Sequence, residues 1–103
     1  MTSRQRLPNR RASETFPIEA AGLHYTATAS WFEDGRLAEI FLSNHKAGSG
    51  ADVNARDAAV VCSLALQYGA PLETIRRALM RDSAGRPNGP LACALDRIAE
   101  RTS

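Results

Sequence analysis

The segment that decides the fold spans residues 14–44 and reads ETFPIEAAGLHYTATASWFEDGRLAEIFLSN. From Leu23 to Ser30, apolar and polar side chains alternate strictly. A period of two in a segment rich in threonine and aromatic residues is typical of β-strands. The alternation is interrupted at Gly22 and at Asp34-Gly35. We therefore expect three strands, near residues 14–20, 23–32 and 36–43.

Turn residues indicate how these strands are connected. Asp34-Gly35 is a strong hairpin signal, because glycine adopts a positive φ at little cost and aspartate tolerates one. Pro17 has no N–H to donate, so the first strand belongs at the edge of its sheet. The segment predicts a three-stranded antiparallel meander.

The period changes after Gly50, where apolar residues recur at helical spacing. This set includes Val53, Leu64 and Tyr68, in a segment so rich in alanine and valine that we expect it to be largely buried. Gly69 is a typical residue to end the helix.

Two further helices follow this first one. Pro71 can open a second helix, since the first helical position needs no N–H. Residues 81–90, RDSAGRPNGP, have the composition of a loop, and Pro90 opens a third helix. The order βββααα predicts an α+β fold in which the helices pack on one face of the small sheet.

Composition and charge divide the chain into two parts. It has 103 residues, of which 44% are apolar and 23% charged, as expected for one globular domain. The net charge is +2, yet all 11 acidic residues lie after residue 11, while residues 1–11 contain four arginines. We assign residues 1–12 to a basic N-terminal arm and residues 13–103 to a single α+β domain.

Apolar runs and cysteine usage suggest the cellular compartment. No apolar run reaches the roughly 20 residues that span a bilayer, and the arginines at the start precede no hydrophobic segment. Cys62 and Cys93 lie in apolar helical patterns, so we expect buried, reduced thiols rather than a disulfide. These features predict a cytoplasmic protein with no membrane association.

The junction FLSNHKAGSG, residues 41–50, resembles a phosphate-binding loop at first sight. A P-loop places its lysine after the glycines, whereas Lys46 precedes them here. Ser49 and Asp52 resemble a capping box, and Asp52 is expected to occupy the free N–H groups at the helix start. We favour an ordinary strand-to-helix connection, with anion or nucleotide contact at Asn44, His45 and Lys46 as the alternative.

The other candidate residues have a structural and a functional interpretation each. His24 and His45 lack the spacing of a zinc site, so no metal is expected. Glu39 falls on the Leu37/Phe41 side of its strand and needs a partner if it is buried. An arginine from the arm or the helices would form a structural ion pair with it; a functional site is the alternative.

The arginines of the arm also allow two interpretations. Arg10 and Arg11 could neutralise phosphates of a nucleic acid, with affinity that falls as salt rises. They could equally attach the arm to an acidic patch on the domain or on a partner.

One further motif carries a family resemblance. It is LQYGAPLE at residues 66–73, which joins the first two helices. In the same order, the chain has Leu7-Pro8, Arg10-Arg11, Asp34-Gly35, Glu39-Ile40-Phe41, and Lys46 with Gly48. From residue 7 to about residue 98, the chain resembles the TSCPD domain. That domain occurs near the C-terminus of adenosylcobalamin-dependent (class II) ribonucleotide reductases and as short stand-alone proteins. The Thr-Ser-Cys-Pro-Asp motif itself is absent.

The resemblance implies a relation to ribonucleoside-diphosphate reductase and to DNA synthesis. Those enzymes use adenosylcobalamin, a large barrel with a radical-bearing cysteine, a redox cysteine pair and a C-terminal dithiol. This chain has two separated cysteines and no room for the barrel. We therefore carry over no catalytic residue and expect neither a cofactor nor an enzymatic activity for this chain alone.

Two hypotheses from different classes follow from these observations. The first is a non-catalytic accessory domain that binds a reductase, a nucleotide or a second copy of itself, with homodimerisation expected. The second is a small nucleic-acid-binding protein that uses the basic arm; a stand-alone enzyme is less favoured than either. The candidate contact residues of the first hypothesis are Arg10, Arg11, Glu39, Asn44, His45 and Lys46.

Overall fold

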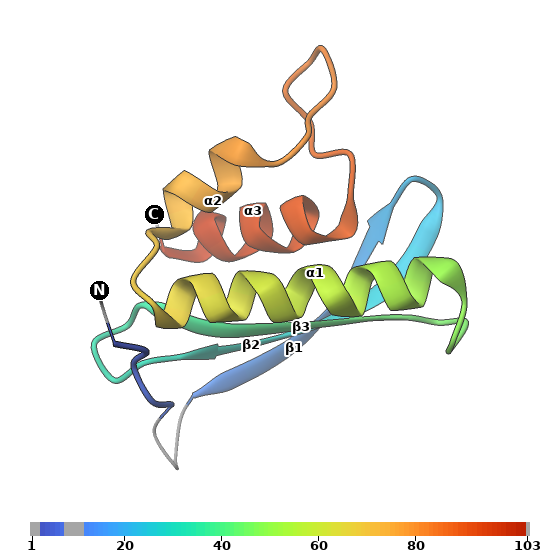
Figure 1. Ribbon diagram of the computed structural model, residues 1–103. Coiled ribbons are helices and arrows are strands. Elements are labelled where there is room, and N and C mark those ends of the chain that lie inside the picture. Colours follow the sequence, from blue (N-terminus) through green and yellow to red (C-terminus); the bar gives the residue numbers. More distant parts are fainter. Residues whose placement is uncertain (1–2, 8–11, 103) are drawn as a thin grey trace.

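The computed structural model describes residues 3–7 and 12–102 (Figure 1). The prediction of three strands followed by three helices is confirmed. The strands are β1 (Ser13–Ala20), β2 (Leu23–Trp31) and β3 (Leu37–Asn44), and the helices are α1 (Gly50–Gln67), α2 (Leu72–Ala78) and α3 (Pro90–Thr102). Within the described residues, no helix is both long enough and apolar enough to span a bilayer.

The sheet is an antiparallel meander with the order β1-β2-β3. Pro17 lies on the edge strand β1, as its missing N–H requires. Gly22 and Gly35 adopt φ values of 77° and 91° in the two turns, where a side chain would be strained. One register shift occurs in β2, between Ser30 and Trp31.

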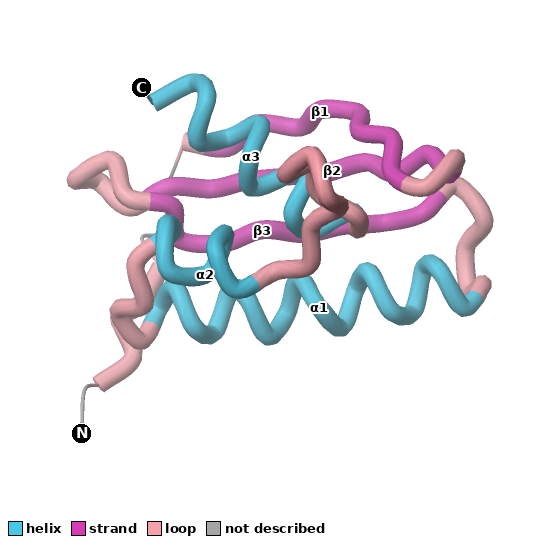
Figure 2. Tube along the Cα trace, turned by 90° about the horizontal axis from the view of Figure 1, so that it is seen from above, coloured by secondary structure: helices cyan, strands magenta, loops and turns pink. Residues whose placement is uncertain are grey.

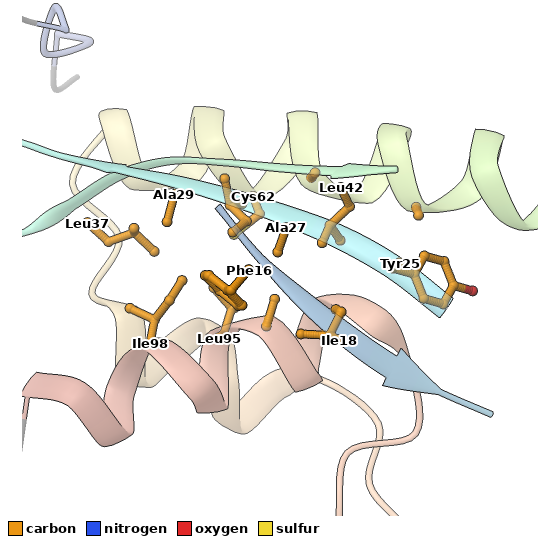
Figure 3. Packing of buried hydrophobic residues seen from close by; sticks show 14 of the residues in the cluster. Phe16, Ile18, Tyr25, Ala27, Ala29, Leu37, Leu42, Cys62, Leu95 and Ile98 are labelled. Carbon is orange, nitrogen blue, oxygen red and sulfur yellow. The ribbon is translucent and has the colours of Figure 1, made fainter. Parts of the chain in front are cut away.

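The hydrophobic core lies between one face of the sheet and the helices (Figures 1 and 3). In Figure 3, Phe16 of β1 lies beside Leu95 of α3, with Ile98 one turn further along the helix. The three largest side chains with almost no exposure are Ile40, Leu95 and Ile98. α2 adds half-buried side chains to this core, which explains why so short a helix is held in place.

An ionic cluster fixes α2 and the following loop to α3. Asp96 on α3 accepts a hydrogen bond from Arg76 Nε at 3.0 Å, and from Arg81 at 2.7 and 2.8 Å. The guanidinium of Arg81 and then that of Arg76 hold the pKa of Asp96 below its usual value. Because each partner belongs to a different element, the cluster fixes their relative positions.

α1 runs along the outer edge of β3 rather than only over the sheet (Figure 2). The Ser63 hydroxyl accepts a hydrogen bond from Ile40 N and donates one to Ile40 O, both at 2.9 Å. Gln67 Nε2 donates to Ala38 O at 3.1 Å. The helix therefore satisfies edge groups that a free strand would leave open to pairing with another chain.

This arrangement corrects the prediction that the segment of α1 is largely buried. The buried side chains are Ala55, Ala59, Cys62 and Leu66, together with polar residues that bind the edge of β3. Among the residues expected inside, Val53 is 48%, Leu64 38% and Tyr68 50% exposed. The face of α1 that contacts β3 carries polar side chains that bond to the strand edge. Part of the apolar residues of the helix therefore lies on its outer, exposed face.

Candidate functional site

The predicted site at Asn44, His45 and Lys46 lies where β3 ends and the chain turns into α1. Asn44 organises this turn: its Oδ1 accepts a hydrogen bond from Lys46 N at 3.0 Å, and its Nδ2 donates to His24 O at 3.1 Å. His45 N also donates to His24 O, at 3.2 Å. The turn is thus tied to the start of β2.

Asp52, in the first turn of α1, is the central acceptor of the junction. Its side chain is 3% exposed and accepts hydrogen bonds from Gly48 N at 3.0 Å, Asn44 N at 2.9 Å and Arg56 Nε at 2.9 Å. The N–H of Gly48, followed by that of Asn44 and the Arg56 guanidinium, holds the pKa of Asp52 below its usual value.

The helix cap was predicted only in part. Ser49 is the N-cap, and its hydroxyl accepts a hydrogen bond from Asp52 N at 3.2 Å, as expected. The expectation that the Asp52 carboxylate occupies the N–H groups of the helix start was wrong, because it binds the N–H of Asn44, at the end of β3, and that of Gly48 in the loop. An acidic side chain reaches back to the loop because the chain turns sharply between the strand and the helix.

The loop offers few backbone donors to an anion. The N–H groups of His45, Lys46, Gly48 and Ser49 each donate to an acceptor within the protein. A phosphate nest requires such N–H groups to point at the ligand. The geometry therefore favours a structural corner over a phosphate cradle.

The two histidines lie together at this corner. The rings of His24 and His45 are stacked with centroids 5.7 Å apart, and Glu19 Oε2 lies 4.0 Å from His24 Nδ1. His24 and Glu19 are both 63% exposed. No group of three His, Cys, Asp or Glu side chains within residues 3–7 and 12–102 could hold a metal ion.

The remaining predicted residues do not join this corner. Glu39 is 9% exposed and lies five residues before Asn44 on β3, about 16 Å away along the strand. It has an interaction within the chain and is not an unpaired buried charge. The arginine ion pair expected for it stays a prediction. Arg10 and Arg11 lie outside the described residues.

The described part of the arm packs on the domain. Arg4 Nε donates to Gln67 Oε1 at 2.6 Å, and Gln5 N donates to Gln67 O at 2.7 Å. Arg36, next to the β2–β3 turn, donates to Gln5 Oε1 at 2.7 Å. These contacts hold the arm against the end of α1.

The two cysteines are not a reactive pair. Both thiols are free. Cys62 is buried, as predicted, and burial raises the pKa of its thiol to about 11. Cys93 is only half-buried, and its Sγ lies 3.8 Å from Glu19 O. Burial raises the pKa of the Cys93 thiol as well, so neither is activated as a nucleophile.

The most prominent surface feature was not predicted as a site. The outer face of α1, defined by Val53, Val60, Val61, Leu64 and Tyr68, exposes between 38% and 67% of each residue. Phe41 on β3, which is 51% exposed, adds to this apolar surface. It lines a hollow of about 330 Å³ together with Val60 and Arg56. The signal in the sequence was that apolar residues of the α1 segment fall on more sides of the helix than the single stripe that one packed face requires.

Comparison with known proteins decides the family. The sequence profile of the TSCPD domain matches residues 4–101. The chain belongs to the TSCPD domain family. Three similar proteins are each named vitamin B12-dependent ribonucleotide reductase. The one from Agrobacterium fabrum is 40% identical over 70 residues, which are 68% of this chain and 6% of the relative.

The other two relatives give the same result. The reductase of Bradyrhizobium diazoefficiens is 36% identical over 73 residues, which are 71% of this chain and 6% of the relative. That of Streptantibioticus cattleyicolor is 37% identical over 71 residues, which are 69% of this chain and 12% of the relative. The matched segment is thus a small part of each relative. No solved structure matches the chain significantly.

Proposed function

We propose that this TSCPD domain is a non-catalytic accessory domain that binds a vitamin B12-dependent ribonucleotide reductase, and that the outer face of α1 is its protein-contact surface. The observation that supports this proposal is the exposed apolar face of α1 with Phe41 beside it. The sequence relation to the reductases supports the choice of partner. The process it would serve is deoxyribonucleotide synthesis, and the expected compartment is the cytoplasm.

The size of this surface is what a contact site needs. Its six apolar residues expose on the order of 500 Å², which is the size of the largest apolar patch on a typical soluble monomer. Such patches commonly mark interaction sites. Binding would remove this area from water, and aromatic side chains such as Phe41 and Tyr68 are frequent at the centres of protein interfaces.

A binding titration tests this function. The chain, labelled at its N-terminus, is titrated with the Agrobacterium fabrum reductase while fluorescence anisotropy is measured. We expect saturable binding that Tyr68→Asp weakens at least tenfold, while Met80→Asp, an exposed apolar residue outside the outer face of α1, leaves it unchanged. Absence of binding, or equal binding by both variants, would contradict the proposal.

Small ligands are tested with a thermal-shift series of ATP, dATP and adenosylcobalamin. A ligand that binds only the folded chain raises its Tm. We expect no rise in Tm, because four backbone N–H groups of the loop already donate to acceptors within the protein. They are those of His45, Lys46, Gly48 and Ser49. A rise abolished by Lys46→Ala would instead support a nucleotide site at the corner.

A further inference from the structure

A second hollow, of about 330 Å³, lies between the first half of α1 and the start of α3, and we call it the α1–α3 hollow. One wall consists of Ala51, Ala55 and Ala58, which recur at helical spacing and so lie on one side of α1. Leu79, after α2, and Leu91, in the first turn of α3, also line it. Because the alanine side chains are short, α1 leaves a space between itself and these leucines.

Tyr25 supplies a polar group to the α1–α3 hollow. Its ring belongs to the hydrophobic core, and the residue is 4% exposed. In Figure 3 its hydroxyl points away from the other labelled side chains of the core. Within the described residues this hydroxyl has no hydrogen-bond partner, although no fully buried side-chain N or O atom there lacks one. The hydroxyl of Tyr25 therefore opens into the hollow that the residue lines, where a ligand can bond to it.

The other lining residues indicate the chemical class of that ligand. Among the described residues that line the hollow, none carries a charge, and Asn54 is the polar side chain besides Tyr25. A charged ligand would lose its hydration there without gaining a partner of opposite charge. Met80, which is 75% exposed, lies at the rim. Methionine side chains adapt their shape and make favourable contacts with aromatic rings. These features favour a neutral aromatic ligand with a polar atom.

The volume of the hollow sets the size of the ligand. Pockets for small molecules occupy about 300–1,000 Å³ and are lined mainly by apolar side chains with a few polar groups. A dry cavity of about 150 Å³ holds one benzene ring, so the α1–α3 hollow, at about 330 Å³, is large enough for two fused rings. We propose that the α1–α3 hollow binds a neutral bicyclic aromatic molecule whose one polar atom bonds to the hydroxyl of Tyr25.

This site is separate from the proposed contact with the reductase. The α1–α3 hollow shares no lining residue with the outer face of α1. Ligand binding and reductase binding can therefore be measured independently, and failure of either one leaves the other standing.

An NMR titration with 2-naphthol tests the proposed ligand site. This probe is neutral at pH 7 and carries one hydroxyl on two fused rings. We expect saturable shifts in the isotope-labelled full chain at Ala51, Ala55, Ala58 and Leu91, and none at Ala84, which is exposed in the loop before α3. Absence of saturable shifts, or shifts confined to the outer face of α1, would overturn the proposal.

A charged probe tests the ligand class. In 2-naphthoate the same two rings carry a carboxylate in place of the hydroxyl. We expect it to bind roughly tenfold more weakly than 2-naphthol, because no charged side chain lines the described hollow. Equal affinity for the two probes would overturn the assignment of a neutral ligand.

Tyr25→Phe tests the role of the hydroxyl, since it removes that group and keeps the ring. The hydroxyl has no partner within the described chain, so the urea midpoint should match that of wild type. The Kd for 2-naphthol should rise about three- to tenfold, the effect of one lost hydrogen bond. An unchanged Kd would overturn the proposed contact with Tyr25.

Filling the hollow provides a second, independent test. Ala58→Phe places a ring in the space that the ligand would occupy and should abolish binding of 2-naphthol. Val61→Phe is the matched control, because Val61 lies on the outer face of the same helix and is 67% exposed; it should leave the affinity unchanged. Binding retained by Ala58→Phe, or lost equally in both variants, would overturn the α1–α3 hollow as the site.

Discussion

Replacing Ser63 by alanine tests how α1 is joined to the sheet. Ser63 is 7% exposed, and its hydroxyl bonds to both the N–H and the C=O of Ile40, which has no exposed surface. Alanine leaves both backbone groups buried without these partners. An unsatisfied buried group costs about 1–3 kcal/mol, so we expect the variant to lose about 2–3 kcal/mol of unfolding free energy. This is a large share of the roughly 5–15 kcal/mol that stabilises a domain.

Urea denaturation followed by circular dichroism measures this loss. With a slope of about 1 kcal/mol per molar urea for a chain of this size, the midpoint should fall by about 2–3 M. Ser83→Ala, at an exposed position in the loop before α3, is the matched control and should change the midpoint little. Equal midpoints for the two variants would refute the view that Ser63 satisfies the edge of β3.

Three further predictions concern stability and cysteine chemistry. Gly69 has a φ of 101° at the end of α1, so Gly69→Ala should lower the unfolding free energy by about 1–2 kcal/mol in the urea assay, whereas Gly50→Ala, without a positive φ, should be neutral or stabilising. Because the pKa of Asp96 is lowered in the folded chain, its ion pairs stabilise the fold above about pH 4, and this stabilisation is lost as the pH falls through the folded-state pKa. We therefore expect Asp96→Asn to be about 2 kcal/mol less stable than wild type at pH 7. The difference in stability between the variant and the wild type should narrow below pH 4. With its pKa raised to about 11, Cys62 should resist iodoacetamide in the native chain at pH 7.5 and react rapidly in urea, as peptide mass spectrometry would show; rapid native labelling would contradict its burial.

The strands and the helix order were predictable from the sequence because they depend on local signals. Alternation in residues 23–30 and the Asp34-Gly35 turn define a hairpin wherever it packs, and Pro17 alone identifies β1 as an edge strand. Gly69 and Pro71 separate α1 from α2 in the same local way.

The orientation of α1 was not predictable, because it depends on the strand edge that the helix covers. Nothing in the local spacing shows that Ser63 and Gln67 bond to backbone groups of β3, about 25 residues earlier in the chain. Once the contact between α1 and the edge of β3 is known, the apolar residues on the opposite side of α1 can be recognised as an exposed outer face. For the same reason, sequence reasoning placed the carboxylate of Asp52 at the helix start instead of on the loop.

The most direct test of the proposed contact surface is a methyl NMR titration. The chain, labelled at valine and leucine methyl groups, is titrated with the unlabelled reductase of Agrobacterium fabrum. We expect the resonances of Val53, Val60, Val61 and Leu64 to shift or broaden first, while those of Leu95, buried on α3, remain until the complex saturates. An unchanged spectrum, or changes that avoid these four residues, would contradict the assignment of the outer face of α1 as the binding surface.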